Sequence, residues 1–161
     1  LKEDNAKYLL RMLVEGLDYI HTKKFVVHRD IKLDNILLDQ SGRIKICDFG
    51  VSRQVTSERE HMHEQCGTPA YIAPEIIRDR GYKGFKSDMW SAGVCLYVML
   101  VGTVPFRAAT MEQLHDAIKR GKYDFQGETI SDSAKDLLSK LIHVNVKKRL
   151  SAYEALQHPW L

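Results

Sequence analysis

Four polar side chains that could act together on a phosphate lie near one another in the sequence: Asp30, Lys32, Asn35 and Asp48. Mg²⁺ accepts oxygen ligands and usually takes one or two protein carboxylates together with phosphates and waters. A carboxylate can also accept the proton of a reacting hydroxyl, and an ammonium can offset charge that develops on transferred oxygens. Phosphoryl transfer needs this combination, because its catalysis is mostly positioning and electrostatic stabilisation.

These four residues stand in ordered motifs. The stretch HRDIKLDN occupies residues 28–35, DFG occupies 48–50, and APE occupies 73–75. A lone Asp-x-Lys is usually a surface pair and a lone Asp-Phe-Gly is often a turn, but three motifs in this order are hard to attribute to chance. In them the sequence resembles the eukaryotic protein kinase superfamily. The resemblance runs over the whole chain and matches the larger, C-terminal lobe of that fold.

The resemblance implies a role for each residue of the cluster. Asp30 would accept or orient the proton of the acceptor hydroxyl, and Lys32 would contact the transferred phosphate. Asn35 and Asp48 would hold magnesium, while Cys47 would line the nucleotide pocket. The implied cofactors are therefore ATP and Mg²⁺, and the implied partner is a protein substrate.

Two positions resemble the serine/threonine branch of the superfamily. Lys32 follows Asp30 by two residues, and Thr68 stands in a Gly-Thr-Pro stretch. In relatives that threonine bridges the catalytic aspartate and lysine, so Thr68 joins the expected catalytic group. The alternative is a simple Gly-Thr-Pro turn. The implied activity is transfer of the ATP γ-phosphate to serine or threonine hydroxyls of proteins.

The resemblance also marks residues that would support the site without taking part in its chemistry. These are His28, Phe49, Gly50, Glu75, Asp88 and Arg149. Glu75 and Arg149 match a buried ion pair, and Asp88 would accept hydrogen bonds from the main chain of residues 28–29. His28 and Phe49 match a stacked apolar spine that couples two lobes.

Glu64 occupies a position at which many relatives carry a phosphorylated Thr or Ser, two residues before a Cys-Gly-Thr-Pro stretch. A carboxylate there could pair permanently with Arg29 and Arg53 and replace part of the charge of a phosphate. We hypothesise that this activation segment needs no phosphorylation at that position. The alternative is that Glu64 is merely solvated.

The hydrophobic pattern predicts a mainly α fold of the kinase C-lobe type. One helix is expected to run to about His21. Residues 36–38 and 44–46 are expected to form a hairpin next to residues 28–35, which are the expected catalytic loop. Residues 51–65 lack apolar periodicity and indicate a long exposed loop. From Ser87 onward we expect a bundle of helices around one that is buried on all sides and reaches Leu100.

Capping residues predict where the later helices begin. Thr110 should begin a helix that stops before Gly121, and Ser131 should begin a helix over residues 132–142. Ser151, with Glu154 three residues later, has the pattern of a capping box for the last helix.

No GxGxxG loop and no Val-Ala-Ile-Lys-type lysine occur in the sequence, and both belong to the smaller, ATP-clamping lobe. We therefore expect residues 1–161 to be one domain, the C-terminal lobe. The clamping lobe would lie in the same natural chain, and the isolated lobe would be inactive. Residue 1 is Leu, which favours a piece of a longer protein. The alternative is a pseudokinase-like scaffold or protein-interaction module without that lobe.

Composition and charge exclude several other classes of protein. The 161 residues are 44% hydrophobic and 28% charged with a net charge of +3, which is typical of a soluble globular domain. Basic residues are scattered, so no nucleic-acid partner is expected. The longest apolar run, residues 89–101, is shorter than the roughly 20 residues that span a bilayer, so no membrane contact is expected.

The three cysteines form neither a CxxC pair nor an even set, which favours a reducing compartment, the cytoplasm or alternatively the nucleus. His61, His63 and Cys66 have the chemistry of zinc ligands, but a fourth ligand is missing from that stretch. A zinc site there is the weaker interpretation.

Two stretches point to different subgroups. Residues 86–94 and the closing His-Pro-Trp at 158–160 look like the calcium/calmodulin-dependent group, whereas residues 32–35 look more like the cyclic-nucleotide and protein kinase C group. We favour the former. That resemblance implies a regulatory domain or a calcium-sensor partner.

Overall fold

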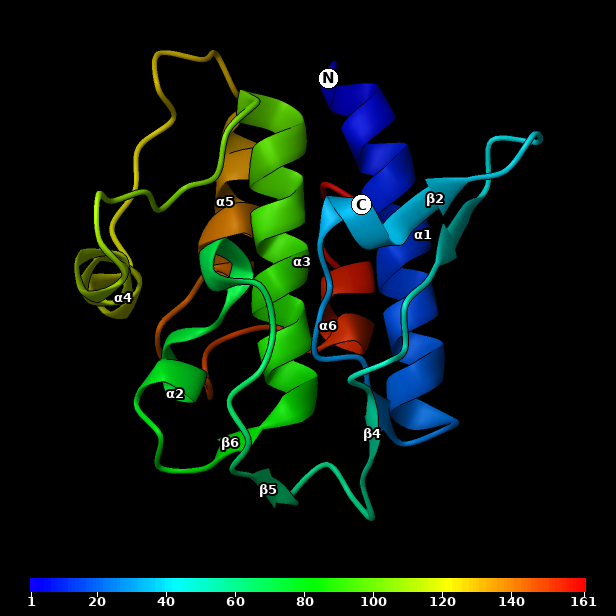
Figure 1. Ribbon diagram of the computed structural model, residues 1–161. Coiled ribbons are helices and arrows are strands. Elements are labelled where there is room, and N and C mark those ends of the chain that lie inside the picture. The colour runs from blue at the N-terminus through cyan, green and yellow to red at the C-terminus, as the bar shows by residue number, and fades with distance from the viewer.

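Figure 1 shows the computed structural model, which describes residues 1–161. Its centre is α3 (Gly84–Val101), a helix that is buried along almost its whole length and ends at Gly102 in the left-handed conformation, with φ of 93°. A helix that is apolar on all sides is stable only when other elements cover it. The prediction of a mainly α bundle around a buried helix is confirmed.

The start of α3 differs from the sequence prediction, which placed it at Ser87. The helix begins one turn earlier, at Gly84, where a Cβ atom would lie 2.5 Å from Val27 Cγ2. Glycine is therefore required for the close contact with that strand. Ser87 is buried inside the helix, and its hydroxyl has two acceptors within hydrogen-bond distance, Glu75 Oε1 at 3.1 Å and Lys83 O at 3.3 Å.

Helix α1 (Glu3–Thr22) runs beside α3, and α6 (Ala152–Leu156) packs against it, as the blue and red helices of Figure 1 show. The apolar face of α1 consists of Leu10, Leu13, Val14 and Leu17, all of them buried. Ser151 forms the predicted capping box with Glu154. The predicted extent of the first helix and the start of the last are confirmed.

The two helices between α3 and α6 begin at the predicted caps. The hydroxyl of Thr110 accepts a main-chain N–H of α4 (Met111–Arg120) at 3.2 Å, and Gly121 ends that helix. The hydroxyl of Ser131 accepts a main-chain N–H of α5 (Asp132–Leu141) at 3.2 Å. Helix α5 packs against α3 and supplies part of the core.

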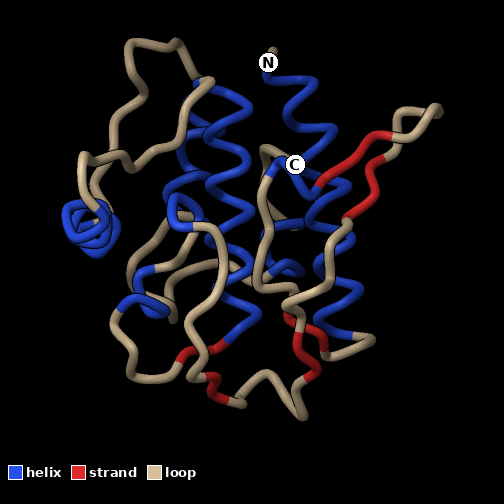
Figure 2. Tube along the Cα trace, in the orientation of Figure 1, coloured by secondary structure: helices blue, strands red, loops and turns tan.

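The predicted hairpin is formed by β2 (Ile36–Leu38) and β3 (Ile44–Ile46), which pair antiparallel with Ile36 opposite Ile46. A short 3₁₀ helix, η1 (Leu33–Asn35), leads directly into β2. Figure 2 shows this hairpin extending from the body of the molecule, with its other end beside the helices. That inner end holds Asn35 and the residues that follow β3.

Two further strand pairs hold the segment that follows the hairpin. Strand β1 (Val26–Val27) pairs antiparallel with β4 (Arg53–Gln54), and β5 (His61–Met62) pairs antiparallel with β6 (Tyr82–Lys83). The expectation of a long exposed loop over 51–65 is therefore wrong in part, because Met62 and Val55 are buried. These two side chains pack in the core, and no periodic pattern of apolar residues in the segment predicts their burial.

The chain between these pairs turns through η2 (Pro69–Tyr71) and a one-turn helix, α2 (Pro74–Ile77). Proline stands in the first turn of each, where its missing N–H has no partner to lose. No helix of the chain is both long enough and apolar enough to cross a bilayer.

Candidate active site

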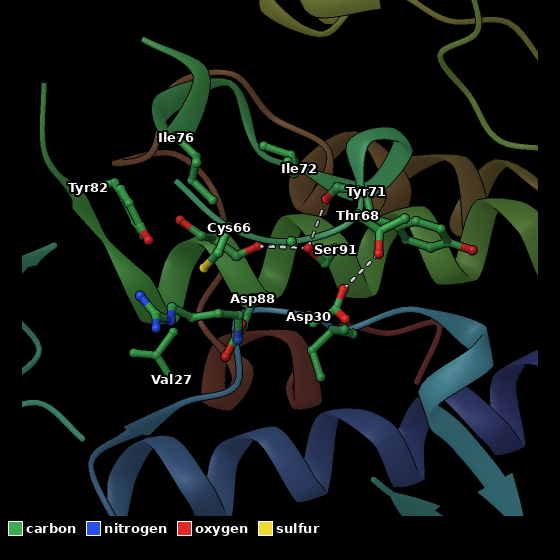
Figure 3. Close-up of a pocket in the computed structure, with 14 residues that line it drawn as sticks. Val27, Asp30, Cys66, Thr68, Tyr71, Ile72, Ile76, Tyr82, Asp88 and Ser91 are labelled. Carbon is green, nitrogen blue, oxygen red and sulfur yellow. Dashed lines mark hydrogen bonds between the residues drawn. The ribbon is translucent and has the colours of Figure 1, made fainter. Parts of the chain in front are cut away.

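Three of the predicted catalytic side chains meet in one hydrogen-bonded group. The hydroxyl of Thr68 donates to Asp30 Oδ1 over 2.9 Å and accepts from Lys32 Nζ over 2.8 Å. Lys32 Nζ also lies 3.7 Å from Asp30 Oδ2. Figure 3 shows the contact between Thr68 and Asp30 as a dashed line in front of α3. A carboxylate, a hydroxyl and an ammonium are thus fixed relative to one another across 38 residues of sequence.

The loop that carries Asp30 is anchored to the buried helix by Asp88. Asp88 Oδ2 accepts the main-chain N–H of His28 at 2.9 Å, and Oδ1 accepts that of Arg29 at 3.0 Å. Arg29 has φ of 73°, a left-handed conformation that costs free energy in a residue with a side chain. Two hydrogen bonds to one buried carboxylate hold the main chain in that conformation. The carboxylate of Asp88 therefore fixes the main chain from which the side chain of Asp30 projects.

His28 joins this loop to the strand that precedes Asp48. Its Nδ1 accepts the main-chain N–H of Asp30 at 3.1 Å, so Nε2 carries the proton and donates to Cys47 O at 2.9 Å. The imidazole also meets the ring of Phe49 edge-on, with the ring centroids 4.7 Å apart. One buried side chain thereby links the segments that carry the two aspartates.

The side chains of Asn35 and Asp48 fit the oxygen ligands that Mg²⁺ prefers. Asn35 is 6% exposed, and its Nδ2 donates to Asp30 O at 2.8 Å, which leaves the amide oxygen without a protein partner. Cys47 N donates to Asn35 O at 2.9 Å and so places Asp48 at the same end of the hairpin. The carboxylate of Asp48 accepts only one weak bond, from Gly50 N at 3.3 Å. Two free oxygen donors suit an ion that keeps phosphates and waters as its other ligands.

Cys47 itself is half-buried, and its thiol donates to Asn35 O at 3.3 Å. The predicted site residues therefore form a connected path: Asp30 to Asn35, Asn35 to Cys47, and Cys47 by the main chain to Asp48. Gly50 follows Asp48 as an exposed residue of the turn.

Glu64 lies against both of the arginines proposed for it. Arg29 Nη1 lies 3.0 Å from Glu64 Oε2, and Arg53 Nη1 lies 3.8 Å from Glu64 Oε1. The side chain of Arg29 is 9% exposed, whereas that of Glu64 is 64% exposed. Burial lowers the pKa of Arg29, but the hydrogen bond with Glu64 and the neighbouring Cys66 and Tyr82 outweigh it and raise that pKa overall. The guanidinium therefore stays charged beside the catalytic loop.

Glu75 and Arg149 form a bidentate ion pair in the interior. Arg149 Nη1 and Nη2 donate to the two carboxylate oxygens of Glu75 over 2.6 and 2.9 Å, and the arginine side chain is fully buried. Its guanidinium lies over the ring of Trp90 at 5.1 Å and donates to His143 O. The segment that begins with APE is thereby tied to the helical core.

The segment that carries Thr68 packs closely on the catalytic loop and α3. The cavity between them, drawn in Figure 3, measures about 10 Å³, room for roughly one water molecule. Ser91 donates to Tyr71 O at 2.9 Å across the same space. Cys66 lies in this wall, where burial raises the pKa of its thiol against the opposing effect of Arg29.

The zinc interpretation finds no support in the geometry. No group of three or more His, Cys, Asp or Glu side chains in the chain is placed to hold a metal ion. His61, His63 and Cys66 therefore do not converge.

Sequence reasoning missed several residues that position the site. His21 Nε2 lies 2.8 Å from Asp88 Oδ2 in the core, and the Tyr82 hydroxyl donates to Glu64 O at 2.6 Å. Both contacts join residues far apart in the sequence, so no motif or short spacing predicts them. Leu37 and Leu38, two and three residues after Asn35, are predicted from the sequence only as strand residues, yet their side chains are 54% and 61% exposed. Adjacent exposed leucines are the signal that could have marked a surface for an apolar group.

Comparison with known proteins agrees with this arrangement. The protein kinase domain family matches residues 1–161. CBL-interacting serine/threonine-protein kinase 5 of Arabidopsis thaliana is 41% identical over 164 residues, which cover 100% of the chain and 36% of that protein. Serine/threonine-protein kinase DCLK3 of Homo sapiens is 41% identical over 168 residues, which cover 99% of the chain and 25% of that protein. The chain thus spans about a third or less of the curated relatives it matches, and it belongs to the protein kinase domain family.

Proposed function

We propose that the protein containing this chain is a serine/threonine protein kinase, which transfers the γ-phosphoryl group of ATP to serine or threonine hydroxyls of proteins. The observation that carries the proposal is the position of Thr68, bonded to Asp30 at 2.9 Å and to Lys32 at 2.8 Å. A hydroxyl held between a carboxylate and an ammonium keeps two oppositely charged groups at a fixed separation. Transfer between two oxygen atoms requires such a fixed arrangement.

Each residue of the group has a chemical task in this proposal. Asp30 would accept or orient the proton of the acceptor hydroxyl as that oxygen bonds to the γ-phosphorus, while the bond from this phosphorus to the bridging oxygen breaks and ADP leaves. Lys32 offsets negative charge on the phosphoryl oxygens, and Thr68 keeps both side chains in place. Electrostatic groups that are fixed before the reaction need no reorganisation as charge develops, which makes them effective.

The cofactors in the proposal are ATP and Mg²⁺. Asn35 and Asp48 would hold magnesium through the amide oxygen and the carboxylate that lack other strong partners. Magnesium, when bound, supplies positive charge to the phosphate oxygens. Cys47 would line the nucleotide pocket, and the exposed Leu37 offers an apolar surface next to the metal ligands.

We assign residues 1–161 to the C-terminal lobe of the kinase. Leu37, Leu38 and Phe49 expose large apolar side chains near Asn35 and Asp48, an arrangement that favours cover by another part of the protein. The ATP-clamping lobe in the same natural chain is the proposed cover. Without that lobe the chain would have little or no transfer activity.

Glu64 would make one phosphorylation of the activation segment unnecessary. Its carboxylate already pairs with Arg29 at 3.0 Å and lies 3.8 Å from Arg53. A phosphate at that position would place its negative charge beside the same two arginines.

We also propose a regulatory domain or a calcium-sensor partner, on the basis of the resemblance to the calcium/calmodulin-dependent group. The name of the Arabidopsis relative specifies interaction with CBL, so a protein of this family with a similar lobe takes a protein partner. We place the protein in the cytoplasm, with the nucleus as the alternative, because Cys47, Cys66 and Cys95 are free thiols.

The test uses the full-length protein with labelled ATP and a mixture of protein substrates. The proposal expects Mg²⁺-dependent label on phosphoserine or phosphothreonine, and loss of that label when Mg²⁺ is chelated. No transfer at high protein concentration, with substrates that related kinases accept, would favour the pseudokinase-like scaffold instead.

A further inference from the structure

A second and larger cavity, about 930 Å³, lies apart from the catalytic group and shares no lining residue with the cavity beside Asp30. Its walls come from the end of α1, the loop between β4 and β5, the start of α3 and the start of α6. The first three of these meet at the lower end of the molecule in Figure 1. Cavities of roughly 300–1,000 Å³ are the size that small-molecule ligands occupy.

Three cationic side chains line this cavity without an acidic partner: Arg59, Lys83 and Lys86. None of them lies within 4.0 Å of a carboxylate, as the ion pairs of the molecule all involve other cations. Lys86 is half-buried and donates only to the carbonyl of Arg149, and burial lowers its pKa. A partly desolvated cation without a counter-ion is unfavourable, so an anion in the cavity would stabilise it.

Two acids also line the cavity, but neither neutralises these cations. Glu58 is exposed and forms no ion pair. Asp18 stands on the α1 wall, and its buried Oδ1 has no hydrogen-bond partner. The first turn of α3, at the cationic wall, contains no acidic residue. Burial lowers the pKa of Lys86 more than the nearby charges of Glu154 and Glu58 raise it, and none of the three cations forms an ion pair with a carboxylate.

Aromatic side chains supply the rest of the recognition surface. Phe25 is 40% exposed and Tyr153 is 64% exposed, and both line the cavity. Phe85 is stacked on His21 with ring centroids 4.4 Å apart, and the pair forms part of the wall. Exposed aromatic rings favour a flat partner that can stack on them.

We propose that this cavity binds a flat aromatic anion, with its phosphate or carboxylate at Arg59, Lys83 and Lys86 and its ring system against Phe25 and Tyr153. The site is distinct from the nucleotide site and needs no phosphoryl transfer. It also contacts the scaffold of the catalytic loop. His21 lines the cavity and is hydrogen-bonded to the carboxylate of Asp88 that holds residues 28–29.

Isothermal titration calorimetry on the full-length protein tests the proposal. The nucleotide site is first saturated with Mg²⁺ and a non-hydrolysable ATP analogue, so that the probes report only on other sites. The probes are 1-naphthyl phosphate, the neutral 1-naphthol and inorganic phosphate. We expect 1-naphthyl phosphate to bind with one-to-one stoichiometry and about tenfold more tightly than either of the others.

Two double variants assign the binding to the cavity. Arg59→Gln with Lys83→Gln should weaken 1-naphthyl phosphate about three- to tenfold, the contribution expected of two partly screened charge contacts. Arg120→Gln with Lys122→Gln removes the same charge from exposed residues that do not line the cavity, and should leave the affinity unchanged. All four residues replaced are exposed, and a melting curve for each variant verifies that it is folded.

Absence of saturable 1-naphthyl phosphate binding would overturn the proposal, as would equal weakening by the two double variants. If the protein binds the probe but transfers no phosphate, the proposed anion site is supported and the proposed kinase function is refuted. The two proposals can therefore be refuted independently.

Discussion

The hydroxyl of Thr68 donates a hydrogen bond to Asp30 Oδ1 over 2.9 Å, and this contact connects the peptide segment after Gly67 to the catalytic loop. Lys32 completes the group through the same hydroxyl. Both partners of the hydroxyl are charged. Removal of the hydroxyl therefore affects the positions of the Asp30 carboxylate and the Lys32 ammonium together. We therefore propose that Thr68 acts as a positioning residue.

Thr68→Ala should lower kcat of the full-length kinase by roughly 10- to 100-fold, since a hydrogen bond to a charged group contributes about 1.5–3 kcal/mol. Thr68→Ser keeps the hydroxyl and should restore most of the activity. Steady-state kinetics with separate kcat and KM for ATP provides the measurement. Equal activity of the alanine and wild-type proteins would show that the bridge has no catalytic consequence.

Glu64→Ala should reduce the activity of the full-length kinase by about fivefold, the factor that corresponds to roughly 1 kcal/mol. The reason is that Arg29, whose side chain is 9% exposed, loses its nearest carboxylate. Glu58→Ala is the matched control, because Glu58 is exposed in the same segment and forms no ion pair. Unchanged activity in Glu64→Ala would mean that the carboxylate is merely solvated.

Glu75→Ala should destabilise the full-length protein by about 3–5 kcal/mol, because it leaves the guanidinium of Arg149 buried without its partner. Chemical denaturation followed by fluorescence measures the effect. Glu75→Gln keeps an acceptor for one of the two bonds and should cost less. A change below about 1 kcal/mol for the alanine variant would contradict the account of this pair, since surface ion pairs have that magnitude.

Glu3 links the start of α1 to the start of α5 and to the last residues of the chain. Its carboxylate accepts from Ser131 N at 2.9 Å, from Ser131 Oγ at 2.7 Å and from Trp160 Nε1 at 3.0 Å. The hydrogen bonds from the hydroxyl and main chain of Ser131 are the main causes that lower the pKa of Glu3 below its ordinary value of 4.5. A lowered pKa means that the folded state favours the ionised carboxylate.

The stabilisation from Glu3 should therefore be complete above pH 4.5 and should be lost as the pH falls below that value. Free energies of unfolding at pH 7 and at intervals down to pH 3, for wild type and Glu3→Gln, measure this dependence. The difference between the two proteins should shrink as the pH falls. Glu112→Gln, in the exposed first turn of α4, serves as the control. A difference that stays constant with pH would show that the charge of Glu3 contributes nothing.

The sequence allows prediction of those features whose cause is local. Thr110 and Ser131 cap their helices as predicted, because a cap depends on a side chain and a main-chain N–H only three residues away. The hairpin around residues 39–42 follows from a turn between two apolar runs. The family motifs likewise identified Asp30, Asn35 and Asp48 from short spacings.

Features decided by packing between distant segments could not be predicted in the same way. Helix α3 begins at Gly84, where the main chain lies close to Val27, and no residue near Gly84 in the sequence predicts that contact. The burial of Met62 has the same origin, since its neighbours in sequence are polar and its packing partners lie elsewhere. The bond between His21 and Asp88 crosses 67 positions, and only the fold brings the two side chains together.

Asp30→Asn in the full-length protein isolates the proposed role of the Asp30 carboxylate, because it removes the proposed base and keeps the size of the side chain. Asp4→Asn, at an exposed position of α1 without a side-chain hydrogen bond, is the control. We expect Asp30→Asn to lower the rate of Mg²⁺-dependent phosphoryl transfer by about 10²–10⁴-fold while ATP affinity stays near the wild-type value. Transfer by Asp30→Asn at the wild-type rate would show that Asp30 is not the base.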